Sequence, residues 1–117
     1  MMMFDVTNTY VLKFNDDFYD PIMAGIKTST IRDEPKPINK GDIIDVCFKP
    51  SERTRTIKIL RHYAIKFNDI NNDIAKREGY LHKTLLEHEL KNIYPNLKSD
   101  DYIYVYEFMD TTRLWTL

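Results

Sequence analysis

The residues best able to do chemistry lie in one short run between Gly25 and Asp33. A lysine, three hydroxyl side chains and an arginine fall within six consecutive positions there, at Lys27, Thr28, Ser29, Thr30 and Arg32. A lysine near a threonine can activate a hydroxyl group without the help of a histidine. An arginine two residues further on supplies a planar, permanently charged donor for an oxyanion, a phosphate or a base edge. The run therefore predicts one wall of a small polar pocket.

The same run also fits a plain solvated strand surface, and strand geometry raises a difficulty for a catalytic interpretation. In a straight strand Lys27 and Thr30 point to opposite faces, because the side-chain period is two. The two can meet only if Lys27 lies on the turn after Gly25, or if a bulge separates them. Thr28 shares a face with Thr30 and Arg32, so it competes with Thr30 for the role of nucleophile.

Hydrophobic periodicity and turn residues indicate the elements that would position this run. Strands are expected over residues 10–14, 28–33, 43–48, 54–64 and 102–108. Helices are expected from residue 16 or 17 to about 24, from a cap at Asn68 or Asp69 to Gly79, and from a capping box at Thr84 and Glu87 to Pro95. Gly25 is placed to end the first helix, and imperfect alternation over 54–64 predicts a bend or bulge. This order predicts an α+β fold, a compact barrel with helices against its openings.

Length and composition restrict the class of protein. The 117 residues predict a single domain over 1–117, with a core from about 11 to 109 and a short C-terminal tail in which Leu114 and Trp115 pack back on the body. A hydrophobic content of 43% and a net charge of -1 exclude a disordered chain and a protein that coats nucleic acid by bulk charge. The one cysteine, Cys47, is expected to be a buried, inert thiol. The sequence has no basic leader and no long apolar run, so we expect a soluble, cytoplasmic protein.

An ordered set of motifs covers nearly the whole chain. It consists of Gly25-x-Lys27-Thr28-x-Thr30-Ile31-Arg32, Gly41-Asp42, Glu78-Gly79-Tyr80, Tyr94-Pro95 and Tyr104-x-Tyr106-x-Phe108. This set resembles the ASCH domain of the PUA-like superfamily over roughly residues 11–109. The resemblance implies a β-barrel of about five or six strands with two to three helices, in a superfamily that often handles RNA or modified bases.

Within that family, the run from Ala24 to Glu34 is most similar to the bacterial N(4)-acetylcytidine amidohydrolases. The resemblance implies a metal-free hydrolase of a linear amide, without a cofactor, in which the catalytic residues are Lys27, Thr30 and Glu78 and the substrate-binding residues are Arg32, Thr28 and Ser29. The segment 75–80 is closer to the broad ASCH pattern, and the tail extends past the usual end of the family. Both departures leave room for a different substrate.

Amide hydrolysis needs a nucleophile, a proton acceptor and a proton donor for the leaving amine. In the implied assignment Thr30 is the nucleophile or positions a water, and Lys27 accepts the proton. Lys27 must then be neutral, through burial or through a nearby cation such as Arg32, which is also placed to stabilise an oxyanion. Glu78 would protonate the leaving amine or bond the base edge, and the negative end of a helix dipole would help to keep it protonated.

Two other functions remain open: a non-catalytic RNA-binding module that holds one flipped base, and an ASCH ribonuclease. A basic stretch with only Glu52 opposing it would serve RNA, or would form a solvated hairpin; it comprises Lys49, Arg53, Arg55, Lys58, Arg61 and Lys66. The three histidines lack ligand spacing, and no glycine loop cradles a phosphate, so we expect no metal and no nucleotide cofactor. The expected partner is a modified nucleoside or RNA, bound by a monomer or a weak homodimer.

Overall fold

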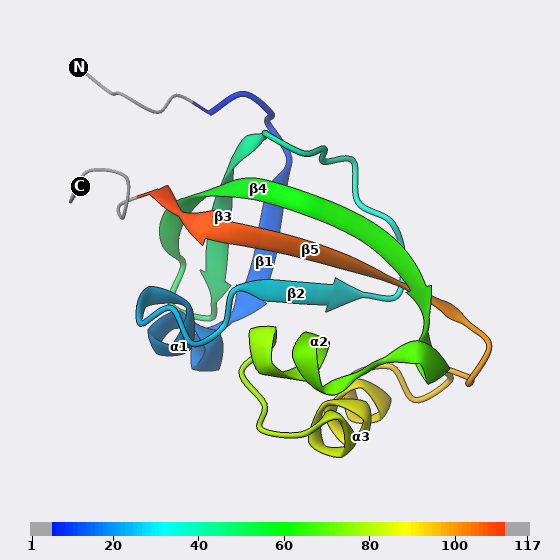
Figure 1. Ribbon diagram of the computed structural model, residues 1–117. Helices are drawn as coiled ribbons and strands as arrows, with labels where there is room; N and C mark the ends of the chain where they lie inside the picture. Colours follow the sequence, from blue (N-terminus) through cyan, green and yellow to red (C-terminus); the bar gives the residue numbers. More distant parts are fainter. Residues whose placement is uncertain (1–5, 112–117) are drawn as a thin grey trace.

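The computed structural model describes residues 6–111 of the chain (Figure 1). Within that range the elements are β1 Val11–Asn15, the 3-10 turn η1 Asp16–Phe18, α1 Tyr19–Met23, β2 Ser29–Arg32, β3 Ile43–Lys49, β4 Arg53–Lys66, the 3-10 turn η2 Phe67–Asp69, α2 Asn72–Arg77, α3 Lys83–Ile93 and β5 Tyr102–Asp110. The predicted order of strands and helices is therefore confirmed. Leu114 and Trp115 lie outside the described residues.

The five strands of the described range form one curled sheet, in the order β1-β3-β4-β5-β2. β1 pairs parallel with β3, and the other three pairings are antiparallel. The sheet bends into a half-barrel that leaves β1 and β2 at its two edges (Figure 1). The run that could do chemistry thus lies on an edge strand, opposite the other edge of the same sheet.

β4 is the longest strand and gives the sheet its curvature. Its pairing with β5 shifts register between Ile59 and Arg61, which confirms the predicted bulge. A bulge bends a strand and increases its twist, so β4 can pair with β3 at one end and with β5 along most of its length. Figure 1 shows β4 arching over the sheet as a result.

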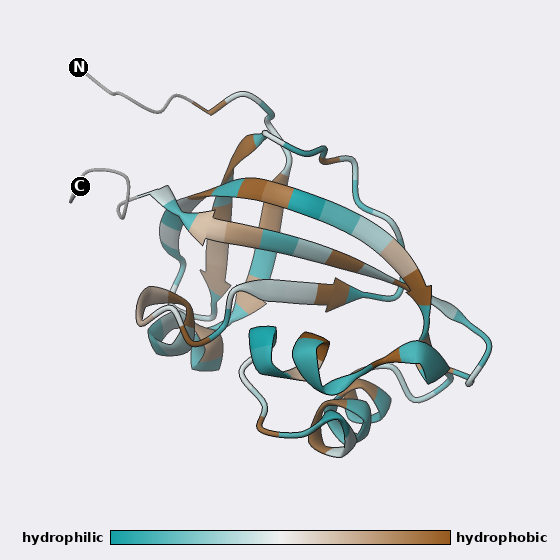
Figure 2. Ribbon diagram, in the orientation of Figure 1, coloured by the Kyte–Doolittle hydropathy of each residue, from teal (hydrophilic) through white to brown (hydrophobic). Residues whose placement is uncertain are grey.

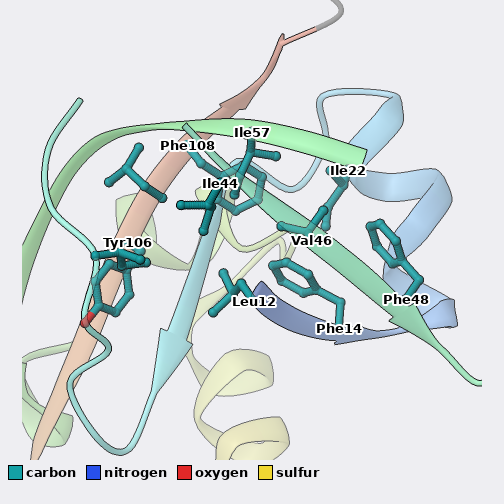
Figure 3. Close-up of a cluster of buried hydrophobic side chains, with 11 residues drawn as sticks. Leu12, Phe14, Ile22, Ile44, Val46, Phe48, Ile57, Tyr106 and Phe108 are labelled. Atoms are coloured by element: carbon teal, nitrogen blue, oxygen red, sulfur yellow. The ribbon is translucent and has the colours of Figure 1, made fainter. Parts of the chain in front are cut away.

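Two clusters of buried side chains hold the fold together. The first lies inside the half-barrel, where apolar side chains from β1, β3, β4 and β5 meet those of α1; Figure 3 labels Leu12, Phe14, Ile22, Ile44, Val46, Phe48, Ile57, Tyr106 and Phe108. The second packs α2 and α3 against β2 and β5 around Ile74, Leu86, Leu90, Ile103 and Val105. Figure 2 shows hydrophilic residues along much of α2 and α3. Cys47 is buried and unpaired, as predicted.

The predicted N-caps of both later helices are wrong. Asn68 and Asp69 belong to η2, and the cap of α2 is Asn71, whose side chain accepts a hydrogen bond from the backbone N–H of Ile74 at 2.9 Å. η2 forms because Phe67 is buried in the second cluster, which delays the start of the helix. Gly79 follows α2 with a positive φ of 93°, so the predicted end of this helix is confirmed.

The N-cap of α3 lies two residues before the expected capping box. It is His82, whose Nδ1 accepts from the backbone N–H of Thr84 at 3.1 Å. Thr84 therefore lies inside the helix, and its spacing to Glu87 does not make a capping box. The longest helix of the described range has 11 residues, and no helix there is long and apolar enough to span a membrane.

Candidate active site

The turn between α1 and β2 places Lys27 outside the alternation of the strand. Gly25 has a φ of 75° after the end of α1, and the backbone N–H groups of Ile26 and Lys27 both donate to the carbonyl of Pro21, at 2.9 Å and 3.1 Å. β2 begins only at Ser29. Lys27 is thus on the turn, which is one of the two arrangements that a site shared with Thr30 requires.

Glu78 is the direct partner of Lys27, although 51 positions separate them in the sequence. The Nζ atom of Lys27 donates to Oε1 of Glu78 at 2.9 Å, and the exposed fractions of the two side chains are 5% and 4%. The lysine also lies over the ring of Phe18, 4.9 Å from its centroid. A buried ion pair of this kind is unusual, because removing two charges from water carries a desolvation penalty of several kcal/mol per ion.

The end of α2 is hydrogen-bonded to the sheet beside this pair. The fully buried hydroxyl of Ser29 donates to Oε2 of Glu78, and the backbone N–H of Thr28 donates to the carbonyl of Arg77 at 2.7 Å. Ser29 is paired across the sheet with Glu107, whose Oε2 lies 3.5 Å from Nε of Arg77. Two consecutive residues of the helix end therefore contact two directly opposed residues of β2 and β5, which fixes where the Glu78 carboxyl points.

Arg32 bridges the two edges of the half-barrel. Its Nε donates to Oγ1 of Thr30 at 3.0 Å, and its Nη2 donates to the backbone carbonyl of Lys13 on β1 at 2.8 Å. The guanidinium also stacks over Phe14, 5.0 Å from the ring centroid. No backbone pairing joins β1 to β2 in the sheet order of the described residues, so the arginine side chain spans the gap between them.

A cavity of about 340 Å³ opens at this gap. It is lined by the predicted catalytic residues Lys27, Thr30 and Glu78 and by Arg32, together with Lys13, Phe14, Asn15 and Phe18 from β1 and the turn that follows it, Ile31 from β2, and Tyr80, Leu86, Glu89, Leu90, Ile93 and Tyr94 from α3 and its flanks. The volume lies near the lower end of the range of small-molecule sites. The walls are mainly aromatic and aliphatic, with the charged groups gathered around Lys27 and Arg32.

Burial shifts the pKa of two ionisable groups in the cavity wall, Glu78 and Arg32. Burial raises the pKa of the Glu78 carboxyl, although the charge of Lys27 and the hydrogen bonds from Ser29 and Lys27 oppose that rise. Burial also lowers the pKa of the Arg32 guanidinium, which remains charged at neutral pH. Titratable groups whose burial disfavours their charged form are common at catalytic sites, since proton transfer requires a group poised between its two forms.

Five of the six predicted site residues meet at this place. Lys27, Thr30, Glu78 and Arg32 line the cavity, and Ser29 reaches it through its contact with Glu78. Thr28 does not line the cavity: its hydroxyl donates to the carbonyl of Arg77 at 3.5 Å and faces a smaller cavity near Ile22 and Met109.

Sequence analysis missed the aromatic walls of the cavity. Phe14 falls in the first predicted strand and Phe18 in the first predicted helix, and neither is predicted to line a site. Tyr94 belongs to the motif Tyr94-Pro95, which carries no predicted role in the site. The signal that could have found Phe14 is its pairing with a cation: an aromatic residue near the end of one edge strand can stack with an arginine of the opposite edge, once the sheet is known to curl.

The basic stretch has many acidic partners in the fold. Four of its six cations form ion pairs: Lys49 with Glu52, Arg53 with Asp16 at 3.9 Å, Arg55 with Asp110 at 3.1 Å, and Arg61 with Glu107 at 2.8 Å. Within the stretch itself only Glu52 opposes the basic residues. This number is too low for the folded protein, because three of the four acidic partners lie far away in the sequence. As for metal ligands, residues 6–111 contain no group of three or more histidine, cysteine, aspartate or glutamate side chains that could hold an ion.

This fold and site define the chain as an ASCH domain. A model of the ASCH domain matches residues 2–112, so the chain belongs to the ASCH domain family. Similar solved structures include an ASCH domain from Lactobacillus crispatus JV V101, with 18% identity and a TM-score of 0.72 over 90% of this chain and 80% of that one. A protein from Enterococcus faecalis V583 aligns with 17% identity and a TM-score of 0.67 over 94% of this chain and 77% of that one.

A mutant of the ZmASCH protein from Zymomonas mobilis, with tyrosine replaced by phenylalanine, is also similar. It has 15% identity and a TM-score of 0.62, over 86% of this chain and 68% of that one. At identities this low, the structural similarity establishes the fold alone. That fold confirms the predicted PUA-like ASCH architecture. No curated protein matches the sequence.

Proposed function

We propose that the protein is an amidohydrolase that removes the acyl group from N(4)-acetylcytidine or a related N-acylated nucleoside or base, using its own side chains and no metal. The observation that carries this proposal is the buried contact of 2.9 Å between Lys27 and Glu78, in the wall of a cavity that also presents Thr30 and Arg32. The contact joins a potential base to a potential acid at the place where a small amide can bind.

The pair can exist in two forms that differ by the position of one proton. In the ionic form Lys27 is an ammonium and Glu78 a carboxylate; in the neutral form the proton resides on Glu78 and Lys27 is an amine. Burial disfavours charge, which agrees with the raised pKa of Glu78. The neutral form supplies both a base and an acid for amide hydrolysis, so it is the form that we propose to be active.

In the proposed reaction, which starts from the neutral form, protons pass between water, Lys27, Glu78 and the leaving nitrogen. A water molecule gives one proton to the Lys27 amine, and its oxygen forms a bond to the carbonyl carbon of the amide. The tetrahedral intermediate expels the N4 nitrogen as its C–N bond breaks, and that nitrogen takes the proton of the Glu78 carboxyl. The products are cytidine and acetic acid, which ionises in water. The ammonium of Lys27 finally returns its proton to Glu78 across their hydrogen bond.

Arg32 and Thr30 complete the arrangement. The Arg32 guanidinium lies beside the reacting groups and would stabilise the oxyanion of the intermediate. Its Nε already donates to the Thr30 oxygen at 3.0 Å, which reduces the nucleophilicity of that oxygen and leaves the hydroxyl proton free to donate. We therefore assign Thr30 to positioning the attacking water rather than to covalent catalysis. Ser29 holds the Glu78 carboxyl in place.

The experiment that tests this function measures release of cytidine from N(4)-acetylcytidine by chromatography. Lys27→Ala and Thr30→Ala are compared with the wild type, and Lys49→Ala is the matched control, because Lys49 is an exposed lysine that also pairs with a glutamate. Loss of general-base catalysis should lower kcat by about 10²- to 10⁴-fold in Lys27→Ala. A folded wild-type protein that releases no cytidine would contradict the proposal, and so would a Lys27→Ala variant as active as the control.

The competing function is a non-catalytic module that binds RNA through the basic stretch. It predicts affinity that falls steeply with salt. The ion pairs of Arg53, Arg55 and Arg61 with acidic side chains reduce the charge that this surface offers to phosphates. The cavity, by contrast, has a buried titratable pair in its wall, which favours catalysis. Binding of single-stranded RNA without turnover of any acylated cytosine would support the module instead.

A further inference from the structure

A second concavity adjoins the catalytic cavity. It is a groove of about 590 Å³ between the end of α3, the turn that follows it and the start of β5, and it shares Ile93 and Tyr94 with the cavity. Neither Lys27 nor Glu78 lines it. Asp33, the residue that directly follows β2, also lines the groove. A ligand that fills the cavity and extends past Tyr94 enters this groove.

The groove differs from the cavity in its charge. The cavity is lined by three basic side chains, Lys13, Lys27 and Arg32, besides its two glutamates. Among the described residues that line the groove no side chain is a cation, and two are carboxylates, Asp33 and Asp101. The groove therefore favours groups that donate hydrogen bonds, and it repels phosphates.

The chemistry of an N4-acylated cytidine matches this division. The acylated N4 and the sugar-bearing N1 lie at opposite ends of the pyrimidine ring, so an amide held at Lys27 and Glu78 directs the sugar away from them. Along β2 the chain runs from Thr30, at the reactive end, to Asp33, at the groove. Three residues of extended chain span roughly 10 Å. This span is comparable to the length of a nucleoside from its amide to its ribose.

We propose that this groove holds the sugar of the substrate, with its hydroxyls donating to Asp33, and that it selects nucleosides over phosphorylated nucleotides and RNA. The proposal rests on the amidohydrolase function proposed above and specifies which substrates that function accepts. Asn96 and Tyr104 complete a polar and aromatic lining that suits a sugar. Asp101 contributes negative charge, but its Oδ2 accepts from the backbone N–H of Lys98 at 2.8 Å, so it also holds the turn.

The test compares kcat/KM for three substrates: N(4)-acetylcytosine, N(4)-acetylcytidine and N(4)-acetylcytidine 5′-monophosphate. Loss of a hydrogen bond to a charged group predicts that the free base is about tenfold poorer than the nucleoside. Repulsion by the carboxylates predicts that the monophosphate is also about tenfold poorer at low ionic strength, with a gap that narrows as salt is added.

Asp33→Asn is the decisive variant, because it removes a negative charge at an exposed position in the groove. We expect it to reduce the preference for nucleoside over monophosphate from about tenfold to about threefold or less. Asp20→Asn is the matched control: it makes the same change at an exposed position on α1, outside both spaces, and should retain the wild-type preference.

The two proposals fail in different ways. If no acylated cytosine is hydrolysed, the amidohydrolase function is wrong. Calorimetric measurement of the binding of cytidine and of cytidine 5′-monophosphate then tests the sugar site in the groove separately. If nucleoside and monophosphate are hydrolysed equally well, or if Asp33→Asn and Asp20→Asn give the same preference, the function stands and the sugar site is overturned. Equal binding of cytidine and its monophosphate, or no binding of either, also overturns it.

Discussion

The chain carries two lysine–glutamate pairs in opposite environments. Lys27 and Glu78 are 5% and 4% exposed at the cavity, whereas Lys49 and Glu52 are 44% and 67% exposed on the β3–β4 hairpin. The exposed pair lies three residues apart and is surrounded by water, so it contributes little to stability. The buried pair joins residues 51 positions apart and carries a desolvation penalty. The desolvation penalty is therefore what distinguishes the buried pair from the exposed one.

The largest expected effect comes from breaking the buried pair. Glu78→Leu leaves the Lys27 side chain buried without its partner, and breaking one side of such a pair costs about 3–5 kcal/mol of the free energy of unfolding. Urea denaturation of wild type and variant measures the loss. The double variant Lys27→Met/Glu78→Leu should recover most of it, since two apolar side chains then pack where two charges lay, yet it should release no cytidine. A double variant as unstable as the single one would mean that packing, and not charge, holds this region.

A smaller effect follows from pH. Burial raises the pKa of Glu78 above its ordinary value of 4.5. Between pH 4.5 and this raised pKa, the folded state therefore binds a proton that the unfolded state has released. Stability must therefore fall as pH rises through this interval, by up to about 1.4 kcal/mol per pH unit. Denaturation curves from pH 4.5 upward, for wild type and Glu78→Gln, measure the slope. The variant lacks this titration, so a slope equal to that of wild type would contradict the expected protonation of Glu78.

The smallest effect is expected at the exposed pair. Glu52→Gln removes one partner of Lys49, and both side chains are then free to be solvated, so the thermal midpoint should move by no more than the error of the measurement. Glu78→Gln, measured beside it by calorimetry, makes the same chemical change in the interior and should lower the midpoint clearly. Similar midpoints for the two variants would remove the contrast between the pairs.

The order of elements could be predicted from the sequence because each rests on local signals. Gly25 ends the first helix, and the register shift of β4 follows from its broken alternation. The N-caps at Asn71 and His82 were missed, since the burial of Phe67 and the packing of the later helices displace the helix starts from their best local signals. Local rules describe an element well until tertiary packing competes with them.

The candidate site was predictable in part for a related reason. The run through Lys27 and Thr30 carries its residue types in one segment, and Glu78 was reached through the family resemblance. The role of Phe14 was not accessible, because it depends on the curl of the sheet that brings β1 opposite Arg32. The pairing of Arg55 with Asp110, 55 residues away, was hidden for the same reason. Contacts between distant segments are set by topology, which no single window of sequence contains.

The placement of β2 has a consequence for the order in which the protein becomes functional. In the sheet of the described residues β2 has one strand neighbour, β5, which spans Tyr102–Asp110 and is made last of the five strands. During synthesis, at about 5–20 residues per second, the segment with Lys27 and Thr30 therefore lacks its strand neighbour for several seconds. A chain that ends before β5 therefore carries Lys27 and Thr30 without the strand that completes their side of the sheet.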